Sequence, residues 1–199
     1  MARMRAKLTP RGRERRAQLM EHATALFADR GYHPTSVSDI VDSLGVGKGV
    51  FYWYFSSKEE LLGEILRDAH LQLRRCHQAA LADEPDPLRR IELGILASLH
   101  WFRDHREYFS ITQFAATDET FAPVLRRSRE VAVADTVRHI KEAIVERRIA
   151  DGEPELLAHA ILGVVDQLTR RYLIERDEPV EQIAAAAIAF CTQGLAGKQ

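Results

Sequence analysis

The stretch that decides the fold is SVSDIVDSLGVGKGVFYWYFSSKEE, residues 36–60. It predicts two short helices joined by a tight turn and followed by the start of a third helix. Ser36 is a candidate N-cap with Asp39 in the capping-box position, and Gly45 can end the first helix in the left-handed conformation. The second helix is expected at Lys48–Tyr54. Two helices separated by about three residues form a helix-turn-helix, whose second helix enters the DNA major groove.

Charge is distributed unevenly along the 199 residues, whose formal net charge is −1. Residues 1–60 hold 10 Lys and Arg against 7 Asp and Glu, and residues 1–16 hold 7 basic residues against 1 acidic residue. A basic end on an acidic body indicates a surface that faces phosphate. The basic N-terminal arm before the first helix either reaches an adjacent minor groove or is a solvated tail.

Helical periodicity recurs through the whole sequence, and no period-two alternation or hairpin dipeptide is sustained. The sequence therefore predicts an all-α chain of about nine helices. We expect them at about 12–30, 37–44, 48–54, 57–83, 87–104, 107–117, 122–149, 154–176 and 179–195.

The side chains of the second short helix suit contact with a DNA groove. Lys48 can reach a phosphate or the edge of a guanine, and Val50 suits a thymine methyl group. Gly49 has no side chain, so the helix backbone can approach DNA closely. The hydroxyls of Tyr52 and Tyr54 can bond phosphate oxygens.

Two helix starts add candidate anion sites to this surface. Lys58 lies beside the free N–H groups at the start of the fourth helix, and Ser36 and Ser38 open the second helix in the same way. The aromatic run 51–55 cannot all face one core, because its side chains point around the helix. We expect Phe51 and Phe55 to face the core and Trp53 to pack against the first helix.

Several other classes of function are excluded by missing signals. The two cysteines, Cys76 and Cys191, form no CxxC pair, which excludes a zinc finger and favours buried, reduced thiols. The longest apolar run, Ile183–Cys191, is about half of a membrane span, and no secretory signal precedes it. No histidine pair has helical zinc spacing, and no nucleophile, zinc-hydrolase or phosphate-loop motif occurs. We expect no catalytic residue, metal, cofactor or membrane partner, and a soluble cytoplasmic protein.

A second copy of the chain is an expected partner, because one short helix recognises few bases and a two-fold site supplies specificity. Gly163 lies inside the eighth helix, where glycine is costly unless it permits close approach. The last helix is rich in small residues. The predicted dimer interface comprises Gly163, Ala187, Phe190 and Gly194.

Residues 13–66 closely resemble the tetracycline-repressor (TetR) family. The resemblance is carried by Gly31-Tyr32, Thr35-Ser36-Val37, Asp39-Ile40, Leu44-Gly45-Val46, Lys48-Gly49, Tyr52-Trp53-Tyr54-Phe55 and Lys58-Glu59-Glu60-Leu61-Leu62. It implies a bacterial, homodimeric transcriptional regulator, usually a repressor, bound to double-stranded operator DNA. Residues 1–60 would then be the DNA-binding domain with its basic arm, and residues 61–199 an effector-binding and dimerisation domain.

The same resemblance implies particular contacts. DNA contacts are implied for Ser36, Ser38, Lys48, Gly49, Val50, Tyr52, Tyr54 and Lys58. Gly47 stands where the family often has serine and Val50 where it often has threonine, so contacts through those hydroxyls do not carry over. The last two helices would form a four-helix bundle across the dimer.

A small-molecule effector would bind between the fourth, fifth and seventh helices, again by resemblance. The candidate residues there are His77, His100, Trp101, Phe109, Phe114, Phe121 and His139. This mixture suggests a mainly apolar or aromatic effector held by a few hydrogen bonds. Because the fourth helix belongs to both parts, its movement would release the protein from DNA.

Three alternatives remain open from the sequence. The large domain can serve only for dimerisation, without a ligand. The regulator can act as an activator or need a corepressor. A small-molecule enzyme on a helical scaffold is the remote alternative.

Overall fold

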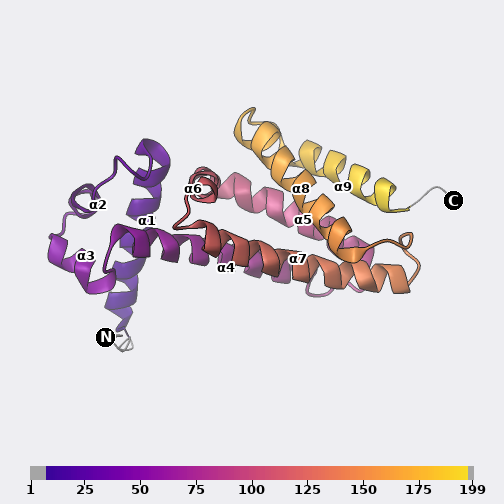
Figure 1. Cartoon of the computed structure of the whole chain (residues 1–199), viewed down its shortest axis with the longest axis horizontal. Coiled ribbons are helices and arrows are strands. Elements are labelled where there is room, and N and C mark those ends of the chain that lie inside the picture. The colour runs from indigo at the N-terminus through magenta and orange to yellow at the C-terminus, as the bar shows by residue number, and fades with distance from the viewer. Residues whose placement is uncertain (1–7, 197–199) are drawn as a thin grey trace.

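The computed structural model describes residues 8–196 and shows an all-helical chain in that range (Figure 1). It contains nine α-helices and one π-helical segment there, with no strand, so the predicted class and helix count are confirmed. The elements are α1 (Pro10–Arg30), α2 (Val37–Ser43), α3 (Lys48–Tyr54), α4 (Lys58–Leu81), α5 (Pro87–Asp104), α6 (Arg106–Thr117), α7 (Ala122–Val145), α8 (Pro154–Leu168), the π-helical η1 (Thr169–Ile174) and α9 (Val180–Ala196).

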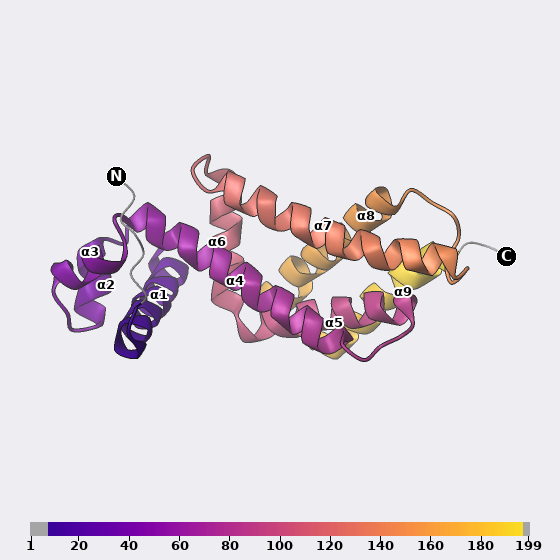
Figure 2. The same ribbon diagram turned by 90° about the horizontal axis from the view of Figure 1, so that it is seen from below.

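Helices α1, α2 and α3 lie together at one end of the molecule, and the other helices extend away from them (Figures 1 and 2). The long helix α4 starts beside α3 and runs along the rest of the molecule next to α5 and α7. Helix α9 packs on α5, and helix α8 packs mainly on α7. One continuous helix therefore connects the helix-turn-helix to the large bundle.

The buried apolar residues form two clusters. One lies inside the large bundle and is built from α5, α7, α8, η1 and α9. The other joins α1, α2 and α3 to the first half of α4, to α6 and to Phe121 before α7. Hydrophobic packing therefore crosses residue 60, and the division into domains at that position stays a prediction.

The ends of the short helices form as the residues there predict. Ser36 caps α2: its hydroxyl accepts from the Asp39 N–H at 3.2 Å, while the Asp39 carboxylate accepts from the Ser36 N–H at 2.7 Å. Gly45 follows α2 with φ of 68°, a conformation that glycine adopts without a Cβ clash. The Val46 N–H then bonds the Val41 carbonyl at 3.0 Å, as in a Schellman motif. The turn between α2 and α3 is thus fixed by local interactions.

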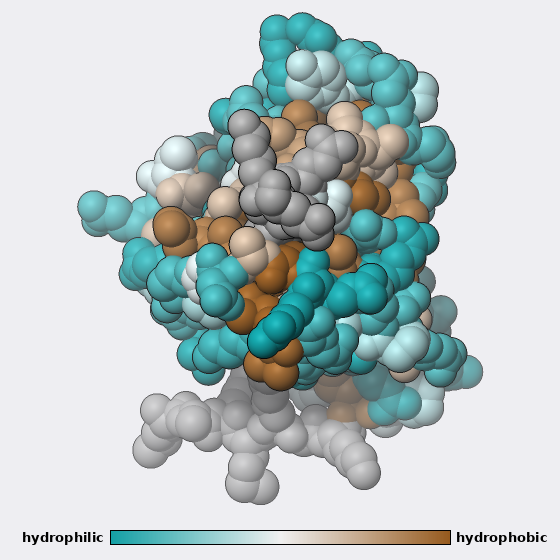
Figure 3. Space-filling model, turned by 90° about the vertical axis from the view of Figure 1, so that its right-hand side faces the viewer, coloured by the Kyte–Doolittle hydropathy of each residue, from teal (hydrophilic) through white to brown (hydrophobic). Residues whose placement is uncertain are grey.

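Some exposed apolar surface remains outside these cores. Seen from the end of the bundle opposite the helix-turn-helix, apolar residues gather in the middle of the face and hydrophilic residues surround them (Figure 3).

In the described part of the chain, no helix has both the length and the apolar character needed to cross a membrane. Cys191 is buried and Cys76 is half-buried, so the expectation of burial holds fully for Cys191 alone; burial raises the pKa of that thiol.

Candidate nucleic-acid interface

Helix α3 divides its residues between the core and solvent. Phe51 is fully buried, and Phe55 directly after the helix is almost fully buried, as predicted for two residues four apart. On the other side Lys48 and Gly49 are exposed and Tyr52 is 52% exposed. The buried rings of the two phenylalanines hold the helix on the core. Its outer face presents the Lys48 ammonium, the backbone of Gly49 without a side chain, and the Tyr52 hydroxyl. That combination suits a surface that enters a DNA groove.

Two other predicted contacts, Val50 and Tyr54, are only partly exposed and pack against the core around α3. Trp53 differs from its prediction. Its side chain is 74% exposed, so the expected packing against α1 is wrong. The two phenylalanines already fill the inward side of this seven-residue helix, which leaves the indole in solvent beside Tyr52.

The start of α2 is exposed, but its polar groups already serve the helix. The Ser36 hydroxyl donates to the Asp39 carboxylate at 2.6 Å, and Ser38 is half-buried on the first turn. Hydrogen bonds from Ser36 hold the pKa of the Asp39 carboxyl below its ordinary value. The predicted DNA contacts of Ser36 and Ser38 stay predictions.

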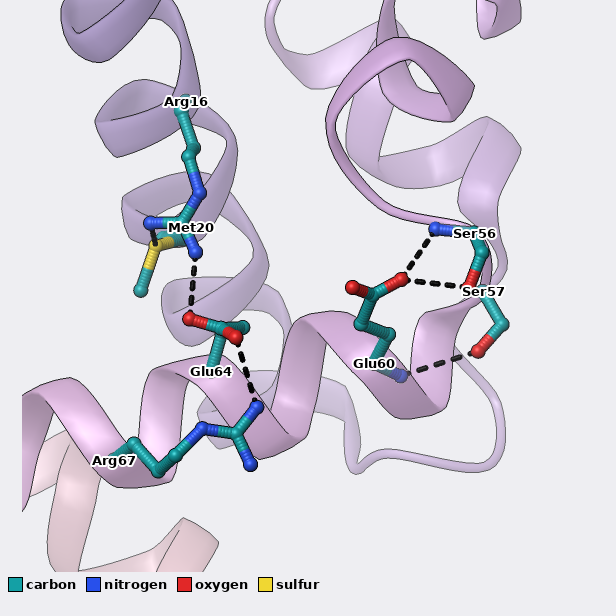
Figure 4. Close-up of polar contacts among 7 residues, drawn as sticks. All are labelled: Arg16, Met20, Ser56, Ser57, Glu60, Glu64 and Arg67. Atoms are coloured by element: carbon teal, nitrogen blue, oxygen red, sulfur yellow. Dashed lines mark hydrogen bonds and ion pairs between the residues drawn. The ribbon is translucent and has the colours of Figure 1, made fainter. Parts of the chain in front are cut away.

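The start of α4 is held by both serines that precede it (Figure 4). Ser57 is the N-cap and accepts from the Glu60 N–H at 3.1 Å, while the Ser56 N–H and hydroxyl donate to the Glu60 carboxylate at 2.7 and 2.6 Å. One turn further, Glu64 accepts from Arg16 of α1 at 2.7 Å and from Arg67 at 2.9 Å. These contacts fix the angle at which α4 leaves the helix-turn-helix.

Lys58 does not point its ammonium outward. Its Nζ donates to the backbone carbonyls of Tyr32 at 2.8 Å and Thr35 at 2.7 Å, and lies 3.4 Å from that of His33. The ammonium also lies 4.3 Å from the centre of the Tyr32 ring, in a cation–π arrangement. Contact of Lys58 with phosphate stays a prediction, in competition with these internal partners.

The seven predicted effector residues do not form one site. Phe114 of α6 and Phe121 before α7 lie against the α1–α2 segment, where their rings contact Tyr32 at centroid distances of 5.1 and 5.4 Å. Trp101 and Phe109 belong to a buried aromatic group at the corner between α5 and α6, in which Trp101 stacks on His105 at 4.6 Å. The four aromatic residues therefore belong to two separate groups, and their contact with an effector stays a prediction.

The histidines separate in the same way. His100 is half-buried near the end of α5, directly before Trp101. His77 of α4 and His139 of α7 do belong to one polar region. His77 Nε2 lies 2.8 Å from the hydroxyl of Ser98 on α5. Burial lowers the pKa of both histidines, and the charge of Asp135 opposes that effect in each.

Sequence reasoning missed the other members of this region, which we call the polar seam. Arg74 of α4 makes two hydrogen bonds to Asp135 of α7, at 2.8 and 3.2 Å, and His70 lies one turn before Arg74. The spacing of 70, 74 and 77 places three polar residues on one face of α4, and that signal was available in the sequence. The polar seam comprises His70, Arg74, His77, Ser98, Asp135 and His139.

Two of the predicted dimer residues, Ala187 and Phe190, lie on different faces of α9. Phe190 is 68% exposed, and a Cβ added at Gly163 would meet no atom within 4 Å. Ala187 is fully buried in the core of its own chain, so its place in a dimer interface was wrong. Gly194 lies in the last turns of α9.

Two hollows lie outside the polar seam. An open groove of about 1760 Å³ runs between α1, the α3–α4 turn, α4 and α6, and a hollow of about 710 Å³ lies between α6, α7 and α8. The second hollow has apolar walls from Leu125, Val133 and Val137. Within residues 8–196, no three His, Cys, Asp or Glu side chains come together as ligands for a metal ion.

Comparison with known proteins decides the family. Residues 19–65 match the family model described as bacterial regulatory proteins, tetR family. The chain is also similar to the HTH-type transcriptional regulator TtgR of Pseudomonas putida, with 32% identity over 175 residues that cover 82% of each chain. The chain belongs to the TetR family. It is therefore a DNA-binding transcriptional regulator and not an enzyme, and the resemblance seen in its sequence is confirmed.

Two further relatives extend the comparison. The HTH-type transcriptional repressor KstR2 of Mycobacterium tuberculosis is 35% identical over 99 residues, which are 50% of each chain. A solved structure of a TetR-family regulatory protein from Rhodococcus RHA1 superposes with a TM-score of 0.80 at 21% identity, over 94% of this chain and 99% of that one. The TetR-like fold thus extends over both the helix-turn-helix and the large bundle.

Proposed function

We propose that this TetR-family chain acts as a homodimeric repressor that binds an inverted-repeat operator and is released by a small effector. The observation that carries the proposal is the division of α3, which buries Phe51 and presents Lys48, Gly49 and Tyr52 to solvent. The assignment as a repressor draws on KstR2, a relative whose name gives that role.

Dimerisation is supported by the outer faces of α8 and α9. Leu156 and Phe190 are 67% and 68% exposed, although large apolar side chains are normally covered. Next to Phe190 along α9, Ala185, Ala186 and Ala189 are also exposed, and Gly163 of α8 leaves open space above its backbone. Small residues let a second pair of helices approach closely, and the aromatic ring gives that contact an anchor.

The polar seam supports an effector site between α4, α5 and α7. His70 Nε2 and His139 Nδ1 are buried polar atoms without a hydrogen-bond partner among the described residues. Buried polar atoms are normally paired, so a ligand that brings a donor or acceptor into the seam would stabilise it. The buried core residues of α5 and α7, such as Leu99 and Ile140, are apolar, which favours an effector with a mainly apolar body and one or two polar groups.

The link from effector to DNA runs through α4. Arg74 and Asp135 fix the middle of this helix to α7, while Lys58 in its first turn bonds the α1–α2 segment. A ligand that prefers one position of α4 would change the distance between the two α3 helices of a dimer. DNA half-sites lie about 34–36 Å apart, so a shift of a few ångströms would break the contact of one helix.

The test of the proposal begins with selection of bound duplexes from a random DNA library by the purified protein. We expect an inverted repeat to be enriched, and Lys48→Ala to bind it about 10- to 100-fold more weakly. The slope of log K against log[salt] should also become shallower by about 1.8, because two copies each lose one phosphate contact and each contact contributes about 0.9 to the slope. Fluorescence anisotropy over a salt series measures both quantities.

Lys141→Ala is the matched control for Lys48→Ala. Lys141 is also an exposed lysine, but it lies on α7. The operator affinity and the salt slope of the Lys141→Ala variant should equal those of the wild type. Absence of an enriched sequence, or equal binding by the Lys48→Ala variant, would refute the proposal that α3 recognises DNA.

The polar seam should also make the stability of the fold depend on pH. Burial lowers the pKa of His77 to about 4, whereas an unfolded histidine titrates near about 6.5. Between these values the unfolded chain binds a proton that the folded chain excludes, so stability is complete above about pH 6.5 and falls as the pH drops toward 4. The loss from this residue is on the order of 3 kcal/mol. Burial lowers the pKa of His70 and His139 in the same direction.

Urea unfolding at several pH values between 7.5 and 4.5 measures this dependence. His77→Gln keeps a polar group near Ser98 but cannot titrate, so its stability should fall less than that of the wild type over this range. His159→Gln, at an exposed position on α8, serves as the control and should retain the wild-type profile. Equal pH profiles for the His77→Gln variant and the wild type would contradict the prediction.

A further inference from the structure

Lys58 is the first residue of α4, and its side chain turns back into the helix-turn-helix. An ammonium has three N–H donors. Two of the nearby acceptors, the carbonyls of Tyr32 and Thr35, lie at 2.8 and 2.7 Å, and the His33 carbonyl lies at 3.4 Å. The donors of Lys58 are therefore directed at the protein's own backbone. Partial burial lowers the pKa of this ammonium, in agreement with its inward position.

The carbonyls that Lys58 contacts belong to the segment between α1 and α2. Their backbone groups have no helix to pair them, and buried backbone groups need partners. Thr35 is almost fully buried in this segment, and its hydroxyl donates to the Gly31 carbonyl at 2.8 Å. Directly afterwards Ser36 caps α2. The position of the segment therefore determines where α2 begins. Because the turn at Gly45 is tight, the position of α2 in turn determines that of α3.

The Tyr32 ring, over which the Lys58 ammonium lies, connects the α1–α2 segment to the large bundle. Tyr32 stacks on Phe114 of α6, with centroids 5.1 Å apart, and meets Phe121 edge-on at 5.4 Å. Both phenylalanines lie at the junction of α6 and α7, outside the helix-turn-helix. Tyr32 thus has Lys58 of α4 on one side and the α6–α7 junction on the other.

We propose that Lys58 is a positioning residue, which holds the α1–α2 segment in the orientation that presents α3 to DNA, and that Tyr32 couples this orientation to Phe114 and Phe121. This inference rests on the proposed recognition of DNA by α3. It gives Lys58 a different role from the phosphate contact that the family resemblance implies. It also gives Phe114 and Phe121 a role in transmission rather than in effector binding.

The experiment compares the full-length wild type with Lys58→Met, Lys58→Arg and Lys48→Ala on the selected operator duplex. Operator affinity is measured over a salt series, and amide hydrogen exchange of residues 31–54 is measured without DNA. A phosphate contact and a positioning contact predict different outcomes, because losing a phosphate contact changes the salt slope and losing an internal clamp does not.

For Lys58→Met we expect affinity to fall about tenfold or more at every salt concentration, with the salt slope of the wild type retained. Amide exchange in α2 and α3 should be about tenfold faster, since local opening becomes easier. Lys58→Arg keeps the charge but cannot place its planar group on the same carbonyls, so it should show the same two changes in milder form. It also provides the test if the methionine variant does not fold.

Phe114→Ala tests the coupling from α6. It should accelerate exchange in the α1–α2 segment, although residue 114 lies outside the helix-turn-helix. Unchanged exchange there would overturn the role given to Tyr32.

Two results would overturn the role given to Lys58. One is a salt slope reduced by about 1.8 in Lys58→Met with unchanged exchange, which is the behaviour of a phosphate contact. The other is full affinity and wild-type exchange in both Lys58 variants. Failure of the proposed function is recognised separately, because Lys48→Ala would then bind the duplex as tightly as the wild type.

Discussion

Replacing Phe190 with glutamate should separate the protein into monomers and weaken operator binding by about 10²- to 10⁴-fold. Phe190 is 68% exposed on α9, so the substitution leaves the core of the chain itself intact. In a dimer, burial of such a ring contributes about 2–3 kcal/mol, and a carboxylate in its place would have to be buried without a partner. Loss of the dimer also removes the linked second half-site, which accounts for the size of the effect on DNA binding.

Sedimentation velocity gives the oligomeric state of this variant, and anisotropy gives its operator affinity. Leu71→Glu is the matched control, because Leu71 is an exposed apolar residue on α4, and α5 packs between α4 and α9. The control should stay dimeric and bind normally. A Phe190→Glu variant that remains a dimer with full affinity would show that α9 does not mediate the pairing.

The parts of the fold that depend on neighbouring residues were predictable from the sequence. The capping box of Ser36 and Asp39 and the left-handed Gly45 act within a few residues, and their geometry leaves few other options. The bounds of the two short helices followed from the same signals, whereas the helix predicted at 154–176 ends at Leu168 and continues as the π-helical η1. The recognition helix was predicted as Lys48–Tyr54, and the structure gives the same bounds.

The interactions of Lys58 could not be predicted in this way. Its partners are backbone carbonyls 23 to 26 residues earlier in the chain, and every residue type carries such a carbonyl. A lysine at the start of a helix beside a DNA-reading helix favoured the phosphate interpretation. Only the packing of α4 against the α1–α2 segment reveals the nearer acceptors.

Helical spacing also does not indicate which of two apolar faces of a helix packs on the core of its own chain and which faces outward. Along α9, Ile183, Ala184, Ala187 and Cys191 face the core of the chain, while Ala185, Ala186, Ala189 and Phe190 face outward. Small residues occur on both faces, so the sequence could not assign Ala187 correctly. The effector candidates fall into separate groups for another reason. Phe109 and Phe114 lie on α6 and Phe121 precedes α7, and the sequence does not indicate which neighbours these segments meet.

Gly49→Leu should separate folding from DNA recognition. A Cβ added at Gly49 meets no atom within 4 Å, and the residue is exposed on α3, so the substitution introduces no clash in the free protein. Its stability should stay unchanged or rise by up to about 1 kcal/mol, because glycine is unfavourable in a helix. Operator affinity should fall on the order of 100-fold, since a side chain now lies between the helix backbone and the base edges. Two copies would each lose groove contacts worth about 1–3 kcal/mol.

Gly94→Ala provides the control for the effect on helix stability. Gly94 lies inside α5, and a Cβ added there also meets no atom within 4 Å. Thermal unfolding should show equal or greater stability for both variants, whereas anisotropy should show weakened binding for Gly49→Leu alone. Retention of full affinity by Gly49→Leu would mean that the outer face of α3 does not lie in the groove. A loss of stability would instead mean that this face is covered in the free protein. Either result contradicts the exposed recognition surface on which the assignment of DNA contacts depends.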